Sequence, residues 1–436
     1  MHVLFAVLAG LGTGGEERGT FTLSARGKVV GEESYRFETV EDHLVCHFSS
    51  RREEGRSDAV LTLSAADLRP LLYAAVHRRG REATELRLEW KNGVLRSRVK
   101  AGGREISRER NTAAREAFLD ERLPSQVVLW ARSQFEDVRM IGESGETTGK
   151  IERAGRRLRW SSGATARTGA GGRVWEISWG DLRWALRPTP EMFAFTRPAG
   201  MDRVPAVLLL STDPALCEAI RGRLIRSGMA VASTEPVPES TLTDEVADAA
   251  AALDWLASRS DVDSSRWAIV GHGDAGLAAA PVVARFPKAR ALFLLATPGR
   301  QYPEVLLARM ERDLRDSGAE ILEDQRRRLR ELAQGSAEFE VIDGRRTFVA
   351  GLRERMRHDP LEALRPVLCP VVLMQGCEDD RIAPENADLL EAALRKAGRT
   401  EVVLSRWDDL DHGFRGKGAS SALDFLVRAA EKALRP

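Results

Sequence analysis

The sequence has few cysteines, few lysines and almost no net charge. Its four cysteines form no C-x-x-C pair and have no histidine at a zinc-binding spacing, so we expect neither a disulfide framework nor a metal site. The chain has 66 Lys and Arg against 65 Asp and Glu, a net charge of +1, which excludes the basic excess of a nucleic-acid binder. Only eight of the 66 basic residues are Lys, and we attribute this excess of Arg over Lys to genomic base composition. No motif requires a cofactor.

Long apolar runs are absent as well, and the longest candidate lies at the N-terminus. Residues 2–12 are nearly all apolar and the first charge is Glu16, which is too short a run for a membrane span but fits the core of a secretory signal. We therefore expect a signal peptide at 1–15 and a secreted or periplasmic protein. The alternative is an N-terminal strand, or a start codon slightly downstream, in a cytoplasmic protein.

The remaining length fits two domains, and their sequence patterns differ. Residues 16–199 contain short alternating segments typical of an antiparallel sheet, and Asn92-Gly93 predicts a hairpin turn. A helix is predicted at 113–135. The tryptophans Trp160, Trp175, Trp179 and Trp184 follow at strand spacing, which favours packing in a core over a lipid or glycan groove.

Residues 200–436 alternate short apolar strands with amphipathic helices, the pattern of a parallel sheet with helical crossovers. Six strands are predicted, at 204–210, 229–232, 267–270, 291–296, 370–374 and 401–404. The Arg-rich helical stretch at 302–365 lies between two of them, where a cap over a site would be inserted. We therefore predict an α/β domain preceded by a smaller antiparallel β-rich α+β domain.

Three sequence blocks of the second half stand out. They are WAIVGHGDAG at 267–276, VVLMQGCEDDRIAP at 371–384 and DHGF at 411–414. Together they resemble the α/β-hydrolase family, and most closely its bacterial serine esterase branch with an N-terminal extension. The resemblance covers about residues 204–434 and implies a mostly parallel sheet with flanking helices and a helical cap.

The first block resembles the nucleophile elbow of this family, G-x-S-x-G between a strand and a helix, in which a strained turn exposes the serine hydroxyl. With Gly271 and Ala275 at the two small positions, Gly273 stands where the serine is expected. The nucleophile is therefore missing. Moving the motif by one residue would make Asp274 the nucleophile, as in dehalogenase-like relatives, but would put His272 at a position that must be small.

The second and third blocks resemble the loops of the family's triad acid and histidine. They imply Asp379 as the acid, with Asp380 a weaker candidate, and His412 as the base. The separations of 106 residues (379 − 273) and 33 residues (412 − 379) follow the family's order of elbow, acid and histidine. Read alone, each is more simply a turn aspartate or an exposed loop histidine.

The oxyanion-binding positions differ from the family's pattern as well. The loop that donates a backbone N–H in active members is Ser211-Thr212-Asp213-Pro214, without glycine, and the second donor would be the N–H of Asp274. Two carboxylates would therefore stand where negative charge has to be stabilised. The loop at 235–240 has no glycine either.

These features lead to three hypotheses. The first is a degenerate pseudo-hydrolase that binds a small ester-like or lipidic ligand, or a partner protein. The second is an active ester or peptide hydrolase in which His412 and Asp379 act with water or Asp274 as the attacking group. The third is an envelope scaffold that binds lipid or glycan through the N-terminal β domain. The sequence does not indicate an oligomeric state.

Overall fold

The computed structural model describes most of the chain beyond residue 16. The described residues are 17–26, 28–53, 55–65, 69–80, 82–111, 117–120, 126, 137–142, 145–154, 156–160, 163–168, 174–186, 193–234, 240–313, 319–337, 339–342 and 345–435. The expected signal peptide at 1–15 lies outside them. The chain divides into two compact units, Met1–Arg187 and Pro188–Pro436, and each is treated by itself.

Fifteen strands among the described residues form a single sheet in the first unit. In chain order they are β1 (Glu17–Ala25), β2 (Lys28–Val40), β3 (His43–Arg52), β4 (Gly55–Ser64), β5 (Pro70–Arg79), β6 (Glu82–Lys91), β7 (Val94–Ala101), β8 (Arg104–Asn111), β9 (Ala117–Asp120), β10 (Asp137–Gly142), β11 (Gly145–Ala154), β12 (Arg157–Trp160), β13 (Thr165–Thr168), β14 (Val174–Trp179) and β15 (Leu182–Leu186).

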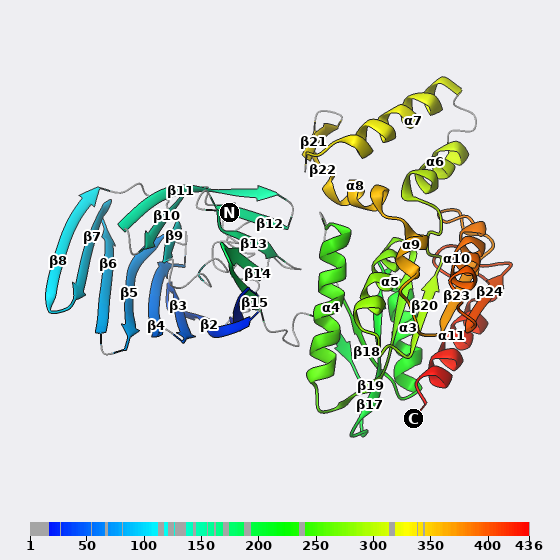
Figure 1. Ribbon diagram of the computed structural model, residues 1–436, viewed down its shortest axis with the longest axis horizontal. Coiled ribbons are helices and arrows are strands. Elements are labelled where there is room, and N and C mark those ends of the chain that lie inside the picture. The colour runs from blue at the N-terminus through cyan, green and yellow to red at the C-terminus, as the bar shows by residue number, and fades with distance from the viewer. Residues whose placement is uncertain are drawn as a thin grey trace. The chain divides into compact units, whose positions relative to one another are not determined.

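The sheet consists of two meanders joined by one long-range strand pair. Its strand order is β8-β7-β6-β5-β4-β3-β2-β1-β15-β14-β13-β12-β11-β10-β9, so β1 and β15 join the two meanders (Figure 1). All pairs are antiparallel except β9 with β10. The hairpin predicted at Asn92-Gly93 is confirmed, because Lys91 pairs with Val94 and both turn residues have positive φ. The helix predicted at 113–135 is wrong at Ala117–Asp120, which is strand β9, and apart from Gln126 the rest lies outside the described residues.

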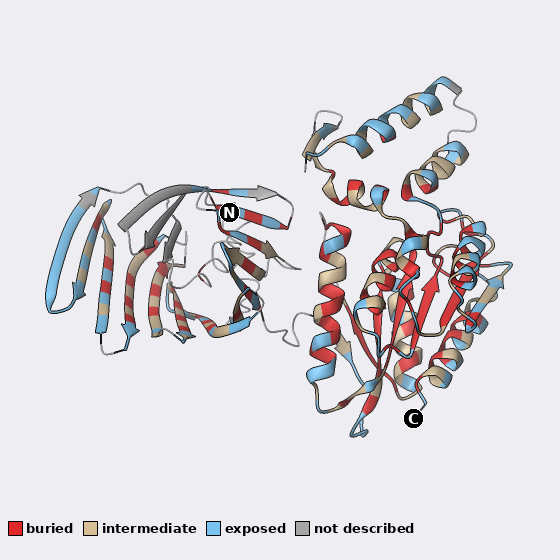
Figure 2. Cartoon of the chain, in the orientation of Figure 1, coloured by how far each residue is buried: buried red, intermediate tan, exposed pale blue. Residues whose placement is uncertain are grey.

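Alternate side chains of this sheet are buried, which is the period of two expected for strands with one apolar face (Figure 2). The largest fully buried side chains are Phe21, Leu23, Leu44, Leu61, Leu63, Tyr73, Leu88 and Trp184. The Nε1–H of Trp184 donates to the buried carboxylate of Glu33 at 3.0 Å, and Trp160 is buried as well. The packing interpretation is therefore confirmed for Trp160 and Trp184.

The second unit contains a seven-stranded sheet. Its strands, in chain order, are β16 (Ala194–Thr196), β17 (Val204–Leu210), β18 (Ala230–Ser233), β19 (Val262–His272), β20 (Ala291–Leu295), β23 (Val371–Gly376) and β24 (Val402–Trp407). The strand order is β16-β18-β17-β19-β20-β23-β24, with β16 antiparallel and all other pairs parallel. All six predicted strands are confirmed. The seventh, β16, was not predicted, and its residues had been grouped with the first half.

Helices cover both faces of this sheet (Figure 1). Their bounds are α3 (Pro214–Arg226), α4 (Leu242–Ser258), α5 (Gly276–Arg285), α9 (Pro360–Leu364), α10 (Glu385–Lys396) and α11 (Ala419–Ala433). Helices α3 and α11 share one apolar cluster with β17, β19, β20 and β23, while α4, α5, α9 and α10 contact one another or the sheet on the other face. The central strands β17, β20 and β23 are buried along almost their whole length, as expected for a parallel sheet covered on both sides (Figure 2).

A cap is inserted between β20 and β23. It consists of α6 (Tyr302–Asp313), α7 (Ala319–Gln334), the hairpin β21 (Phe339–Ile342) and β22 (Arg345–Phe348), and α8 (Ala350–Arg357). The buried guanidinium of Arg353 connects α8 to the end of α7 and to β21. It donates to the carbonyls of Leu332 and Ala337 and to Glu340. The neighbouring Glu354 accepts from the backbone N–H of Thr243, so the cap is anchored at the start of α4.

Gly376 allows a close approach of two loops that follow β23 and β24. A Cβ at this position would collide with the backbone carbonyl of Leu410 and lie 2.9 Å from the carbonyl oxygen of Asp411. We expect Gly376→Ala to lower the free energy of unfolding of the full chain by about 1–3 kcal/mol in urea titrations, because the backbone has to move.

Gly222→Ala in α3 is the matched control for this prediction. A Cβ there meets only the end of the Arg226 side chain, at 3.5 Å, so alanine should stabilise the helix by about 0.5–1 kcal/mol. Equal effects of the two substitutions would contradict the close approach at Gly376.

Candidate functional site

The first part of the site is the turn between β19 and α5. The strand ends at His272, Gly273–Ala275 forms a single 3₁₀ turn, and α5 begins at Gly276. Gly273 has a φ of +57°, the left-handed conformation that the strained turn of a nucleophile elbow requires. A Cβ on Gly273 would lie 3.0 Å from Nε2 of His412. Position 273 therefore faces the imidazole at close range.

The second part is a buried carboxylate paired with His412. Asp379 follows β23 and His412 follows β24, and His412 Nδ1 lies 2.9 Å from Asp379 Oδ2. Asp379 Oδ1 accepts the backbone N–H groups of Arg381 and Ile382, both at 2.8 Å, and Oδ2 also accepts from Gln375 Nε2 at 3.1 Å. Asp379, which was predicted to be the acid, thus lies beside the predicted base.

The electrostatics of this pair favour an ionised acid. Burial raises the pKa of Asp379, but the hydrogen bond and charge of His412 and the two backbone N–H groups outweigh it, so the net pKa lies below its usual value. An ionised carboxylate only accepts hydrogen bonds, so Nδ1 of His412 carries the proton. When the ring carries no second proton, its lone pair is on Nε2, the atom that faces Gly273. Asp380, the weaker candidate, is exposed.

A second histidine, His272, links the site's three loops. Its Nε2 lies 2.9 Å from the backbone carbonyl of His412, which can only accept, so Nδ1 accepts from the hydroxyl of Ser211 at 2.9 Å. The two imidazole rings lie 4.8 Å apart. Burial is the main reason that the pKa of His272 falls to about 4, with the neighbouring His412 adding to the effect. No sequence motif predicts this role of His272.

The predicted oxyanion positions differ in their surroundings. Ser211 is buried and bonded to His272, whereas Thr212 is exposed. Asp213 caps α3 through the N–H of Leu216, at 3.0 Å, and pairs with Arg415 at 2.8 Å. Burial raises the pKa of Asp213, yet these partners and the nearby His272 bring it below its usual value. The negative charge at this position is therefore largely engaged by local donors.

Asp274 is also engaged. Its Oδ2 accepts the hydroxyl of Tyr302, the first residue of α6, at 2.7 Å. Burial and the adjacent carboxylate raise the pKa of Tyr302, so its hydroxyl keeps its proton. Asp274 is thus a contact between the elbow and the cap.

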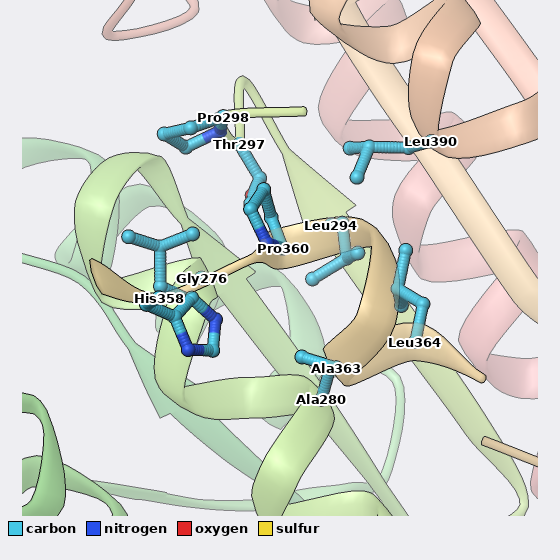
Figure 3. A pocket seen from close by; sticks show the side chains of 11 residues that line it. Gly276, Ala280, Leu294, Thr297, Pro298, His358, Pro360, Ala363, Leu364 and Leu390 are labelled. Carbon is cyan, nitrogen blue, oxygen red and sulfur yellow. The ribbon is translucent and has the colours of Figure 1, made fainter. Parts of the chain in front are cut away.

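A small cavity lies beside the start of α5 (Figure 3). Its lining includes Gly276, Thr297, His358, Leu364 and Leu390, and it has room for about one water molecule. The buried Nε2 of His358 has no hydrogen-bond partner among the described residues, and burial lowers the pKa of this imidazole. The cavity is too small to hold a substrate.

The described part of the chain contains neither a cluster of metal-binding side chains nor a helix that could span a membrane. No three His, Cys, Asp or Glu side chains gather there as a metal ion would require. None of its helices is both long and apolar enough to span a bilayer.

Comparison with known proteins gives fold likeness alone. No family model and no curated protein matches the sequence. Among solved structures, one of the metagenome-derived lipolytic enzymes LipS and LipT has a TM-score of 0.40 and 17% identity, over 55% of this chain and 97% of its own. Est1E from Butyrivibrio proteoclasticus with ferulic acid bound has 0.40 and 16%, over 55% and 92%. A puromycin-hydrolyzing peptidase of Mycobacterium tuberculosis has 0.43 and 12%, over 92% and 68%. The second unit is a mostly parallel sheet with helices on both faces.

The buried His272 makes the stability of the protein depend on pH. Its folded pKa of about 4 lies below the unfolded value of 6.5, so the unfolded chain binds more protons between these values and stability falls as the pH drops from 6.5 to 4. The full effect is about 3 kcal/mol. We expect urea titrations across this range to show the loss in wild type and a smaller one in His272→Gln.

The glutamine retains an amide that can bond both Ser211 and the carbonyl of His412. Asp379 and Asp213 have lowered pKa values, so their contributions to stability are lost only below the usual aspartate range and do not mask this window. An identical slope in wild type and His272→Gln would contradict the assignment.

Proposed function

We propose that the second unit is a catalytically degenerate α/β-hydrolase that binds a small ester-like or lipidic ligand. One observation carries the proposal: Nε2 of His412, oriented by the buried Asp379, faces the α-carbon of a glycine at the elbow. His412 and Asp379 are in hydrogen-bonding contact, but the serine that would attack an ester is missing. The family's acyl-enzyme cannot form at Gly273.

The positions that would stabilise an oxyanion support the same conclusion. The N–H next to the elbow belongs to Asp274, whose carboxylate stays close to any developing negative charge. Asp213 is better neutralised than Asp274, because Arg415 is charged whereas Tyr302 is a neutral donor. We therefore regard Asp274 as the main remaining obstacle.

Restoring the serine should not restore an efficient enzyme. In Gly273→Ser the new Cβ requires His412 to move by a few tenths of an ångström, and the left-handed φ should cost about 1–2 kcal/mol of stability. We expect weak fluorophosphonate labelling and slow turnover of short-chain p-nitrophenyl esters in this variant. Wild type should not be labelled.

The double variant Gly273→Ser, Asp274→Asn tests the reason. Asparagine keeps an oxygen that can accept the hydroxyl of Tyr302 but removes the charge beside the oxyanion. We expect the double variant to be faster than Gly273→Ser by about tenfold to 10²-fold in kcat/KM. Asp274→Asn alone is the control and should remain inactive. Strong esterase activity in Gly273→Ser alone would overturn the argument.

The alternative function is direct hydrolysis by water. It is favoured by the position of Nε2 of His412, which could act as general base for a water beside Gly273, an effect worth about 10²- to 10⁴-fold. Attack by Asp274 has less support, because its carboxylate is bonded to Tyr302.

Turnover of p-nitrophenyl acetate separates the two functions. His412→Asn removes Nε2 but keeps an N–H donor near the position of Nδ1, so the buried carboxylate of Asp379 retains a partner. If the protein is a degenerate hydrolase, wild type and His412→Asn should hydrolyse p-nitrophenyl acetate at equal rates. A rate that falls by about 10²-fold or more in the variant would establish the water mechanism instead.

A further inference from the structure

The outward face of β6, β7 and β8 carries ordered rows of charge. Register pairs Glu85 with Lys100 and Lys100 with Glu105. Four residues further along, Glu89 pairs with Arg96 and Arg96 with Glu109. In both rows a cation on the central strand lies between two carboxylates, which is the favourable arrangement for directly opposite side chains.

The row between these two breaks the pattern. Here Arg87 lies directly opposite Arg98, and Arg98 opposite Ser107. Two like charges directly opposite one another are destabilising, and a serine stands where both neighbouring rows have a glutamate. Arginine is common throughout this chain, so its number here means little. The informative feature is that the alternation of charge fails in this row.

The partners of the two arginines leave much of each guanidinium available. Arg87 Nε bonds Glu89 at 2.7 Å along its own strand, and Arg98 Nε lies 3.3 Å from Glu105 on the diagonal. Among the residues that the structure describes, no hydrogen bond to a terminal Nη group of Arg87 or Arg98 is found. The hydroxyl of Ser107 likewise has no partner within that part of the chain.

This row lies in a surface hollow of about 440 Å³. Its lining includes Arg87, Arg98 and Ser107, together with Arg96, Arg108 and Glu109. The volume is in the range of small-molecule sites. The two guanidinium groups offer paired N–H donors in one plane, and the hydroxyl of Ser107 offers a single O–H donor. Donors of both kinds bind the oxygens of phosphate-like anions.

We propose that this hollow binds a tetrahedral oxoanion of the phosphate class, free or as a headgroup. The anion completes the middle row by supplying the negative charge that the flanking rows take from glutamates. A simpler interpretation is a solvated ladder of surface ion pairs, each of little energetic value. That interpretation accounts for the two outer rows but not for opposed arginines beside a serine. The proposal is independent of the chemistry at Gly273.

The test uses inorganic phosphate on the full chain. At constant ionic strength, phosphate in place of chloride should raise the melting temperature of wild type and give a saturable heat in calorimetric titration. Arg87→Gln and Arg98→Gln should each weaken binding by about tenfold. Arg26→Gln is the control, because Arg26 is an exposed arginine of the same unit, in the turn after β1, paired with Asp181, and the variant should bind like wild type.

Arg87→Glu separates binding from folding. It gives the middle row a glutamate opposite Arg98, so the melting temperature without phosphate should stay the same or rise, while the phosphate response should disappear. A wild type that does not respond to phosphate, or an Arg87→Glu variant that responds equally, overturns the proposal.

Vesicles then identify the source of the anion. Binding to phosphatidylglycerol but not phosphatidylcholine vesicles, lost in Arg87→Glu and competed by free phosphate, supports a headgroup in the hollow. A phosphate response without vesicle binding supports a soluble phosphate ligand. Vesicle binding that survives in Arg87→Glu, in a protein that ignores inorganic phosphate, contradicts the site.

Discussion

The geometry of the site depends on the burial of one carboxylate. The side chain of Asp379 is inaccessible to solvent, and it accepts hydrogen bonds from two backbone N–H groups, from Gln375 and from His412. A buried charge that loses a partner destabilises a protein by several kcal/mol, so His412 contributes to stability as well as to any chemistry. This explains how an acid and base in working geometry can persist opposite a glycine. Their presence is therefore no evidence of catalysis.

The contacts of His272 strengthen this view. By bonding Ser211 through one nitrogen and the carbonyl of His412 through the other, it joins the loop after β17 to the loop after β24 through the end of β19. The ion pair of Asp213 with Arg415 makes a second connection between the same two loops. Asp213, which the sequence suggested would oppose an oxyanion, thus has a structural role that does not require one. Asp213 and His272 are therefore part of the packing between these loops.

Local sequence predicted the second unit well and the first only partly. Apolar runs identified the six parallel strands, and motif spacing identified Asp379, His412 and the turn at Gly273. The strand β16 has only three residues, too few for a periodic pattern, and its antiparallel partner β18 is distant in sequence. The pairing of β1 with β15 joins residues about 160 positions apart, which no local pattern encodes. The bonds of His272 were missed for the same reason, since their partners lie 61 and 140 residues away.

The arginines show that strand register can identify a charged site that amino-acid composition does not reveal. A count of 66 basic and 65 acidic residues describes a neutral surface, and most described arginines do pair with a carboxylate. Arg353 is buried and holds the cap together, and Arg415 connects two loops of the site. Only strand register reveals that Arg87 and Arg98 face each other without a carboxylate in their row. Positive charge that is balanced over the whole chain can still lack a carboxylate partner at one place in a sheet. The residues paired across the neighbouring strands identify that place.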